Sequence, residues 1–190
     1  MRDKSKKNTI IVGFILLAVS LLLAAADRYT KVLAVQYVKP EGSISLIKFG
    51  ETEALNFTYA ENTGMSFSLL EGQRVILILA PVILIGLVEW YIFSGKAKRL
   101  DSMIALSVLA GGGLGNLYDR VFQGYVVDFI DVRLINFAIF NFADMCAVCG
   151  GIYFGIVMLL TESQEEKAEK SLKHSAIDKD VLMDKTDEQT

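Results

Sequence analysis

The sequence has little of what soluble enzymes use for catalysis or metal binding: its 190 residues include one histidine, two cysteines and two prolines. One histidine is too few to complete a zinc site with the cysteines. The net charge of −3 and the local clustering of basic residues give no nucleic-acid-binding pattern. Apolar residues instead make up 53% of the chain, with a mean hydropathy of +0.42. This composition indicates an integral membrane protein.

Four apolar stretches are candidates to span a bilayer: residues 10–26, 75–93, about 103–117 and about 142–160. Each is short, because about 17 helical residues cover ~26 Å of a ~30 Å hydrocarbon core. We therefore expect polar ends at the interface or local thinning of the bilayer. Four glycines interrupt the third stretch, and Gly111 and Gly115 form a G-x-x-x-G pattern. We interpret them as a helix-packing surface, since a phosphate-binding loop would need a following Lys-Ser/Thr.

Lysine and arginine residues predict the orientation. They precede the first apolar stretch, from Arg2 to Lys7, and fill the connection between the second and third, from Lys96 to Arg99. Both regions, and both termini, should then be cytoplasmic. A cleaved signal peptide is the alternative for the first stretch, but three more spans follow it, so we expect it to be retained. The segments 27–74 and 118–141 should emerge on the outer face.

The predicted fold is a membrane all-α bundle of four transmembrane helices with a small extracytoplasmic β-sheet subdomain. Residues 43–49 and 55–59 alternate between apolar and polar, and 125–132 form a third strand-like segment. We expect a β insertion at about residues 32–60. After Thr161 the composition becomes charged, which predicts a four-helix membrane domain over 1–160 and a cytoplasmic tail over 161–190, partly helical or disordered, with a solvated His174.

The two cysteines form a C-x-x-C motif inside the fourth apolar stretch. Cys146 and Cys149 share one helical face there, with no further Cys or His ligand nearby. We interpret them as small buried helix residues and expect neither a metal nor a cofactor.

Asp128 and Asp144 are the candidate catalytic residues. Both lie in or beside apolar segments, where an ionisable group costs about 2.5–3.5 kcal/mol at a helix centre and therefore points to a function. A short connection brings them to one membrane face. Two carboxyl groups that share one proton supply both a general base and a general acid. Such acid/base chemistry needs no metal, nucleophilic serine or histidine.

Five motifs carry a family resemblance: Asp27-Arg-Tyr-Thr-Lys31, Asn62-Thr-Gly-Met-Ser-Phe67, Gly115-Asn-Leu-Tyr-Asp-Arg120, Gly124-Tyr-Val-Val-Asp-Phe129 and Phe140-Asn-Phe-Ala-Asp144. In order and spacing they resemble the signature blocks of bacterial prolipoprotein signal peptidase (signal peptidase II). The resemblance covers about Ile10 to Leu160. One departure is Met65-Ser66, where the family often has two small residues, and we expect it to alter the wall of the substrate pocket.

The resemblance implies a membrane aspartic endopeptidase of the bacterial cytoplasmic membrane. Its substrates would be diacylglyceryl-modified prolipoproteins, cut before the lipidated cysteine by water that the Asp128–Asp144 dyad activates. Membrane lipid would be its other partner, and the chain would act as a monomer. Nucleic acid would not be a partner.

Further polar residues are expected to support the dyad. Asn141 lies one helical turn before Asp144 and is predicted to orient its carboxyl group. Asn62, with Gly64 beside it, is predicted to reach the substrate backbone from the outer loop.

Two groups of charged residues have two interpretations each. Asn116, Asp119 and Arg120 share one helix face, and the two charged residues either form buried ion pairs across the bundle or contact the substrate. Asp27 and Lys31 have i, i+4 spacing, and we favour a surface ion pair over a catalytic contribution.

Other classes of membrane protein fit less well. A transporter or channel would place carboxylates in a bundle, but usually with internal repeats or a polar stripe through several spans. Here the polar residues gather near one end. A structural adaptor would need no pair of aspartates there.

Overall fold

The computed structural model describes residues 2–65, 69–97 and 99–187, with side chains for 8–65, 69–97, 99–164 and 167. Its elements are α1 (Arg2–Leu33), the π-helical turn η1 (Ala34–Val38), β1 (Ser43–Phe49), β2 (Thr52–Asn62), α2 (Arg74–Phe93), α3 (Leu100–Phe122), β3 (Val126–Asp131), the 3-10 turn η3 (Arg133–Ile135) and α4 (Phe142–Asp187). The described residues contain four helices long and apolar enough to cross a membrane, and one three-stranded sheet. The predicted fold class is confirmed.

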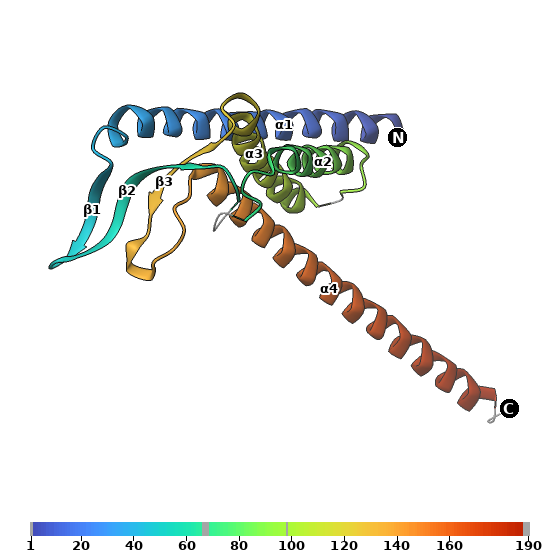
Figure 1. Ribbon diagram of the computed structural model, residues 1–190. Coiled ribbons are helices and arrows are strands. Elements are labelled where there is room, and N and C mark those ends of the chain that lie inside the picture. Colours follow the sequence, from blue (N-terminus) through green and yellow to red (C-terminus); the bar gives the residue numbers. More distant parts are fainter. Residues whose placement is uncertain (1, 66–68, 98, 188–190) are drawn as a thin grey trace.

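Helix α3 is the centre of the bundle. It packs against α1, α2 and α4, whereas α2 and α4 have little contact with each other (Figure 1). Half of its apolar window is buried, against 17–22% in the other three spans. A helix that faces other helices rather than lipid needs less apolar surface, which explains its low hydropathy.

The glycines of α3 form the packing surface that the sequence predicts. A Cβ atom at Gly111 would lie 3.0 Å from the Ser20 carbonyl oxygen of α1, and one at Gly112 would lie 2.7 Å from the Ala147 backbone nitrogen of α4. The absence of side chains at these positions lets the backbones of three helices approach closely.

The sheet extends beyond the C-terminal end of α1, away from the N-terminus of the chain (Figure 1). Its strand order is β1-β2-β3, and both pairs are antiparallel. Strand β2 is longer than expected because its pairing with β3 continues to Asn62, which lies opposite Val126. This register brings Asn62 beside Asp128, two residues further along β3.

Two helices extend beyond their apolar segments. Helix α1 continues past Ala26 to Leu33 because polar residues of its outer turns are bonded within the bundle, as described below. Helix α4 continues to Asp187 through a segment rich in Lys and Glu, which favour helix. The side chain of His174 lies outside the described part of the chain.

The expectation for the cysteines is only half right. Cys146 is buried, whereas Cys149 is exposed on α4. Side chains three residues apart in a helix differ in direction by about 300°, which is about 60° short of a full turn. That rotation takes Cys149 away from the face that packs on α3.

Candidate active site

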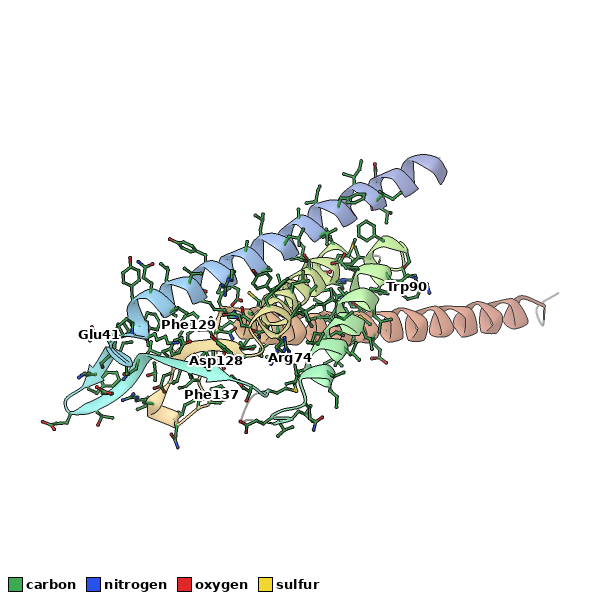
Figure 2. All side chains as sticks on the ribbon, turned by 45° about the horizontal axis from the view of Figure 1, so that its top comes forward. Glu41, Arg74, Trp90, Asp128, Phe129 and Phe137 are labelled. Atoms are coloured by element: carbon green, nitrogen blue, oxygen red, sulfur yellow. The ribbon has the colours of Figure 1, made fainter. Side chains whose placement is uncertain are left out.

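Asp128 lies on β3, where the sheet meets the helix bundle (Figure 2). It is 3% exposed. Its carboxylate accepts hydrogen bonds from Asn62 Nδ2 at 2.9 Å and from Asn141 Nδ2 at 2.6 Å. Burial raises the pKa of Asp128 to about 6, and the nearby Asp144 carboxylate adds to this effect, while the bonds from Asn62 and Asn141 oppose it.

Asp144 lies in the first turn of α4 and is held by a reciprocal helix cap. The Asn141 backbone N–H donates to Asp144 Oδ2 at 3.0 Å, and the Asp144 N–H donates to Asn141 Oδ1 at 3.0 Å. This arrangement satisfies two N–H groups that a helix start otherwise leaves unpaired. The other carboxylate oxygen of Asp144 accepts a bond from Asn116 Nδ2 at 2.7 Å. The predicted contact between Asn141 and Asp144 is therefore present.

The amide of Asn116 is oriented by a lysine. Its Oδ1 atom accepts bonds from Lys31 Nζ at 2.8 Å and from Asn141 Nδ2 at 3.1 Å. Because ammonium and amide N–H groups only donate, this oxygen cannot exchange places with Nδ2. The amide nitrogen is thus fixed toward Asp144, and the Asn141 amide contacts both Asn116 and Asp128.

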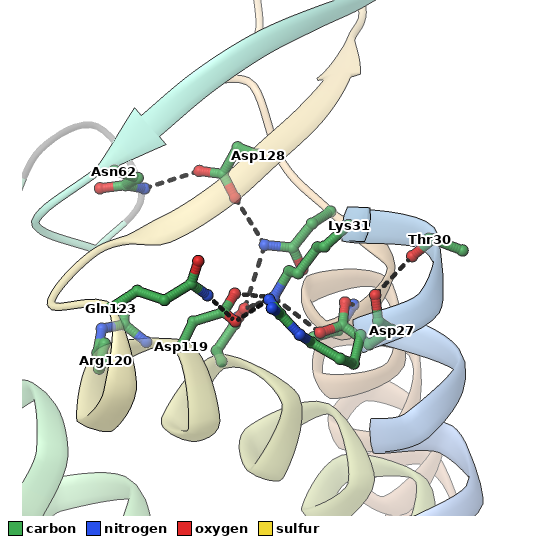
Figure 3. Close-up of polar contacts among 12 residues, drawn as sticks. Asp27, Thr30, Lys31, Asn62, Asp119, Arg120, Gln123 and Asp128 are labelled. Carbon is green, nitrogen blue, oxygen red and sulfur yellow. Dashed lines mark hydrogen bonds and ion pairs between the residues drawn. The ribbon is translucent and has the colours of Figure 1, made fainter. Parts of the chain in front are cut away.

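Lys31 belongs to a buried charged cluster, shown in Figure 3. Its Nζ atom lies 2.7 Å from Asp27 Oδ2 and 2.8 Å from Asp119 Oδ2, and all three side chains are at most 1% exposed. Asp27 and Lys31 form an ion pair, as predicted, but the prediction that this pair lies on the surface is wrong. It is buried because α1 packs against α3, where Asp119 also contacts the lysine. Asp27 also accepts a bond from the Ala143 N–H at 2.9 Å, which ties α1 to the start of α4.

Asp119 and Arg120 point in different directions. Asp119 joins the buried cluster, as the ion-pair interpretation predicts. Arg120 instead reaches the loop after β2, where Nη2 donates to the Gly64 carbonyl at 2.7 Å. The Gly64 N–H in turn donates to Asn62 Oδ1 at 2.9 Å. Asn62, which was expected to reach the substrate, is thereby held against Asp128.

The sequence interpretation missed Arg74, at the start of α2. Its Nε atom donates to the Arg120 carbonyl and its Nη2 atom to the Val121 carbonyl, both at 3.0 Å. These carbonyls lie in the last turn of α3, where a cation is favourable. Its place in the sequence, at the start of an apolar helix, gives no signal of these contacts.

Both aspartates line one pocket of about 380 Å³ between α2, α3 and α4. Asn62, Met65, Asn116 and Arg120 also line it, and Ser66 falls outside the described residues. The other residues that line the pocket are mainly apolar, and the sequence analysis did not identify most of them. Residues of α2 contribute much of it at helical spacing: Ile76, Leu77, Ala80, Pro81, Leu84 and Ile85.

This geometry suits proton transfer at one end of an apolar ligand. Two carboxyl groups are held by a shared asparagine, and the pKa of Asp128 is raised toward neutrality. Among the residues whose side chains are described, 8–65, 69–97, 99–164 and 167, no group of three or more His, Cys, Asp or Glu is placed to hold a metal ion.

Fold and site define a class: a multi-pass membrane protein with paired carboxyl groups at the end of an apolar pocket. The sequence model described as signal peptidase (SPase) II matches residues 10–160. The chain therefore belongs to the signal peptidase II family. It is a bacterial membrane protease of the aspartic type that removes signal peptides from prolipoproteins.

Individual relatives agree. The lipoprotein signal peptidase of Syntrophomonas wolfei subsp. wolfei is 37% identical over 147 residues, which cover 77% of this chain and 94% of the relative. That of Streptococcus pneumoniae is 34% identical over 158 residues, covering 83% and 97%. A solved structure, titled as a bacterial membrane enzyme obtained by the in meso method, matches with a TM-score of 0.71 at 28% identity. The match covers 79% of this chain and 90% of that one.

Proposed function

We propose that Asp128 and Asp144 are the catalytic pair and that they cut a diacylglyceryl-modified prolipoprotein immediately before the lipidated cysteine. The observation that carries the proposal is their shared setting. Both carboxyl groups line the same apolar pocket, and Asn141 donates a hydrogen bond to each. The raised pKa of Asp128, about 6, favours a pair that keeps one proton at higher pH than an ordinary carboxyl group would.

In the proposed reaction the ionised carboxylate removes a proton from a water molecule as its oxygen attacks the scissile carbonyl carbon. The protonated carboxyl group transfers its proton to the carbonyl oxygen, which becomes a hydroxyl group of the tetrahedral intermediate. The carboxyl group that took the water proton then gives it to the amide nitrogen, the other carboxylate takes a proton back from a hydroxyl group, and the carbon–nitrogen bond breaks to leave an amine and a carboxylic acid. The shared proton belongs to the Asp128–Asp144 pair rather than to one residue.

Arg120 is proposed to bind a substrate carbonyl group. Its Nε atom is buried and has no hydrogen-bond partner among the described residues, although the side chain lines the pocket. A buried donor without a partner costs about 1–3 kcal/mol. A peptide carbonyl in the pocket would satisfy it.

The signal peptide is proposed to enter from the side, between α2 and α4. These helices both pack on α3 but have little contact with each other, and the wall from α2 is apolar. An apolar helix in the bilayer could pass between them without crossing water. Membrane lipid around a monomeric enzyme completes the proposal.

We also propose that the site lies near the outer face and that both termini are cytoplasmic. The site shares one end of the bundle with the sheet, and the basic connection at Lys96 and Arg99 follows the far end of α2. Residues 161–190 would then form a charged cytoplasmic extension.

The test is cleavage of a lipidated precursor peptide by purified protein in detergent. Asp128→Asn and Asp144→Asn should each reduce kcat by at least about 10³-fold, because asparagine cannot exchange the proton. Asp101→Asn, at the opposite end of α3, is the matched control and should retain activity. EDTA and cysteine reagents should have no effect.

Circular dichroism must show that the variants fold. Turnover within about tenfold of wild type by either dyad variant would contradict the assignment. So would loss of activity on chelation that a specific metal restores.

A further inference from the structure

A second pocket, of about 230 Å³, meets the first one at Asp128. The two share Asn62, Asp128 and Ile139 in their linings. The second pocket differs in character, because its wall includes Glu61, Thr63 and Glu71 in place of the apolar residues of α2. Asp128 thus separates an apolar pocket from a polar one.

A peptide substrate must continue on both sides of the bond that is cut. The apolar pocket between the helices suits the signal peptide, whose central region is apolar. The chain after the lipidated cysteine must leave Asp128 in another direction. The polar pocket opens there, bordered by the end of β2 and the loop before α2, outside the apolar spans.

The polar pocket carries negative charge. Tyr59 and Lys39 donate hydrogen bonds to Glu61 at 2.8 and 3.1 Å, and these bonds keep the pKa of Glu61 below its usual value. The Thr63 hydroxyl donates to Glu71 Oε1 at 3.1 Å and fixes this carboxylate at the pocket wall. Lys39 offsets the charge of Glu61, so Glu71 dominates. Of the described residues, no lysine or arginine lines this pocket.

We propose that the polar pocket binds the residues that follow the lipidated cysteine, and that Glu71 makes it favour lysine or arginine over glutamate or aspartate there. This inference rests on the proposed cleavage site. Because Glu71 is exposed, the preference is modest, about threefold in kcat/KM. High salt should reduce it by screening the charges.

The experiment uses lipidated peptides that are identical through the cysteine and carry Lys or Glu at the next two positions. Wild-type enzyme should cleave the Lys peptide about three times more efficiently, and Glu71→Gln should bring the ratio close to one. Glu51→Gln, an equally exposed carboxylate at the turn between β1 and β2, is the matched control and should keep the wild-type ratio. Each ratio is measured within one enzyme, so differences in the amount of folded protein cancel.

Equal ratios for wild type and Glu71→Gln would overturn the inference, as would a wild-type ratio of one. Mass spectrometry of the products separates this failure from that of the proposed function. Cleavage before the lipidated cysteine without a charge preference removes the polar subsite alone. Cleavage elsewhere, or cleavage that survives Asp128→Asn, removes the proposed function itself.

Discussion

The side-chain amide of Asn141 donates a 2.6 Å hydrogen bond to the carboxylate of Asp128. The same residue caps α4 by exchanging two hydrogen bonds with Asp144. One asparagine therefore links the strand that carries one aspartate to the helix that carries the other. The relative position of the two carboxyl groups depends on its side chain.

Replacing Asn141 with alanine should reduce kcat by about 10²-fold and leave KM nearly unchanged. The substitution removes the bond to Asp128 and half of the cap on Asp144, and displacement of a reacting group by about 1 Å costs this much. Steady-state kinetics on a lipidated peptide would measure both constants. Gln36→Ala, an exposed amide on η1, is the control. A variant with wild-type kcat would show that the dyad does not need this link.

The pH dependence of kcat/KM should follow the raised pKa of Asp128. The active pair carries one proton, so activity falls when that proton is lost as the pH rises above about 6. Bound apolar substrate excludes water and favours the protonated form, so the decline in kcat should occur at higher pH than the decline in kcat/KM. Initial rates across the pH range would test this. A kcat/KM that rises steadily from about pH 6 to about pH 8 would contradict the one-proton mechanism.

Replacing Lys31 with methionine should destabilise the protein strongly. The change leaves Asp27 and Asp119 buried without their shared cation, and removing one partner of a buried ion pair costs about 3–5 kcal/mol. Thermal unfolding in detergent would show a lower midpoint. Lys48→Met removes an exposed pair with Glu53 and should change the midpoint little. Equal midpoints for the two variants would mean that the cluster does not stabilise the bundle.

Replacing Gly112 with alanine should disrupt the packing of α3 on α4. The new methyl group would lie 2.7 Å from the Ala147 backbone nitrogen and closer still to the Ala143 carbonyl oxygen. These are backbone atoms, so relief requires the helices to separate, and activity and thermal stability should both fall. Gly155→Ala, which adds a methyl group with nothing within 4 Å, should cause neither loss. If Gly112→Ala behaves like this control, the close approach of the helices is not required.

The sequence was sufficient for the features that depend on local pattern. Apolar runs predicted the four helices, alternation predicted β1 and part of β2, and helical spacing predicted the contact between Asn141 and Asp144. The ordered motifs indicated the family to which the chain belongs.

Features that depend on long-range packing were not predictable in this way. The i, i+4 spacing of Asp27 and Lys31 gave their pairing but not their burial, because burial requires Asp119 from a distant helix. Likewise, Asn62 contacts Asp128 because β2 pairs with β3 as far as its last residue. Spacing along one segment could therefore identify neither Asp119 as a partner of Lys31 nor Asp128 as a partner of Asn62.

The proposed entry of the substrate between α2 and α4 has a consequence for measuring affinity. A ligand that reaches the pocket by this route comes from the bilayer, so its effective concentration is the number of ligand molecules per area of membrane. Adding lipid or detergent at constant ligand and enzyme dilutes the ligand in that surface. Apparent dissociation constants in molar units will therefore increase with the amount of lipid, and values from different preparations become comparable only as mole fractions.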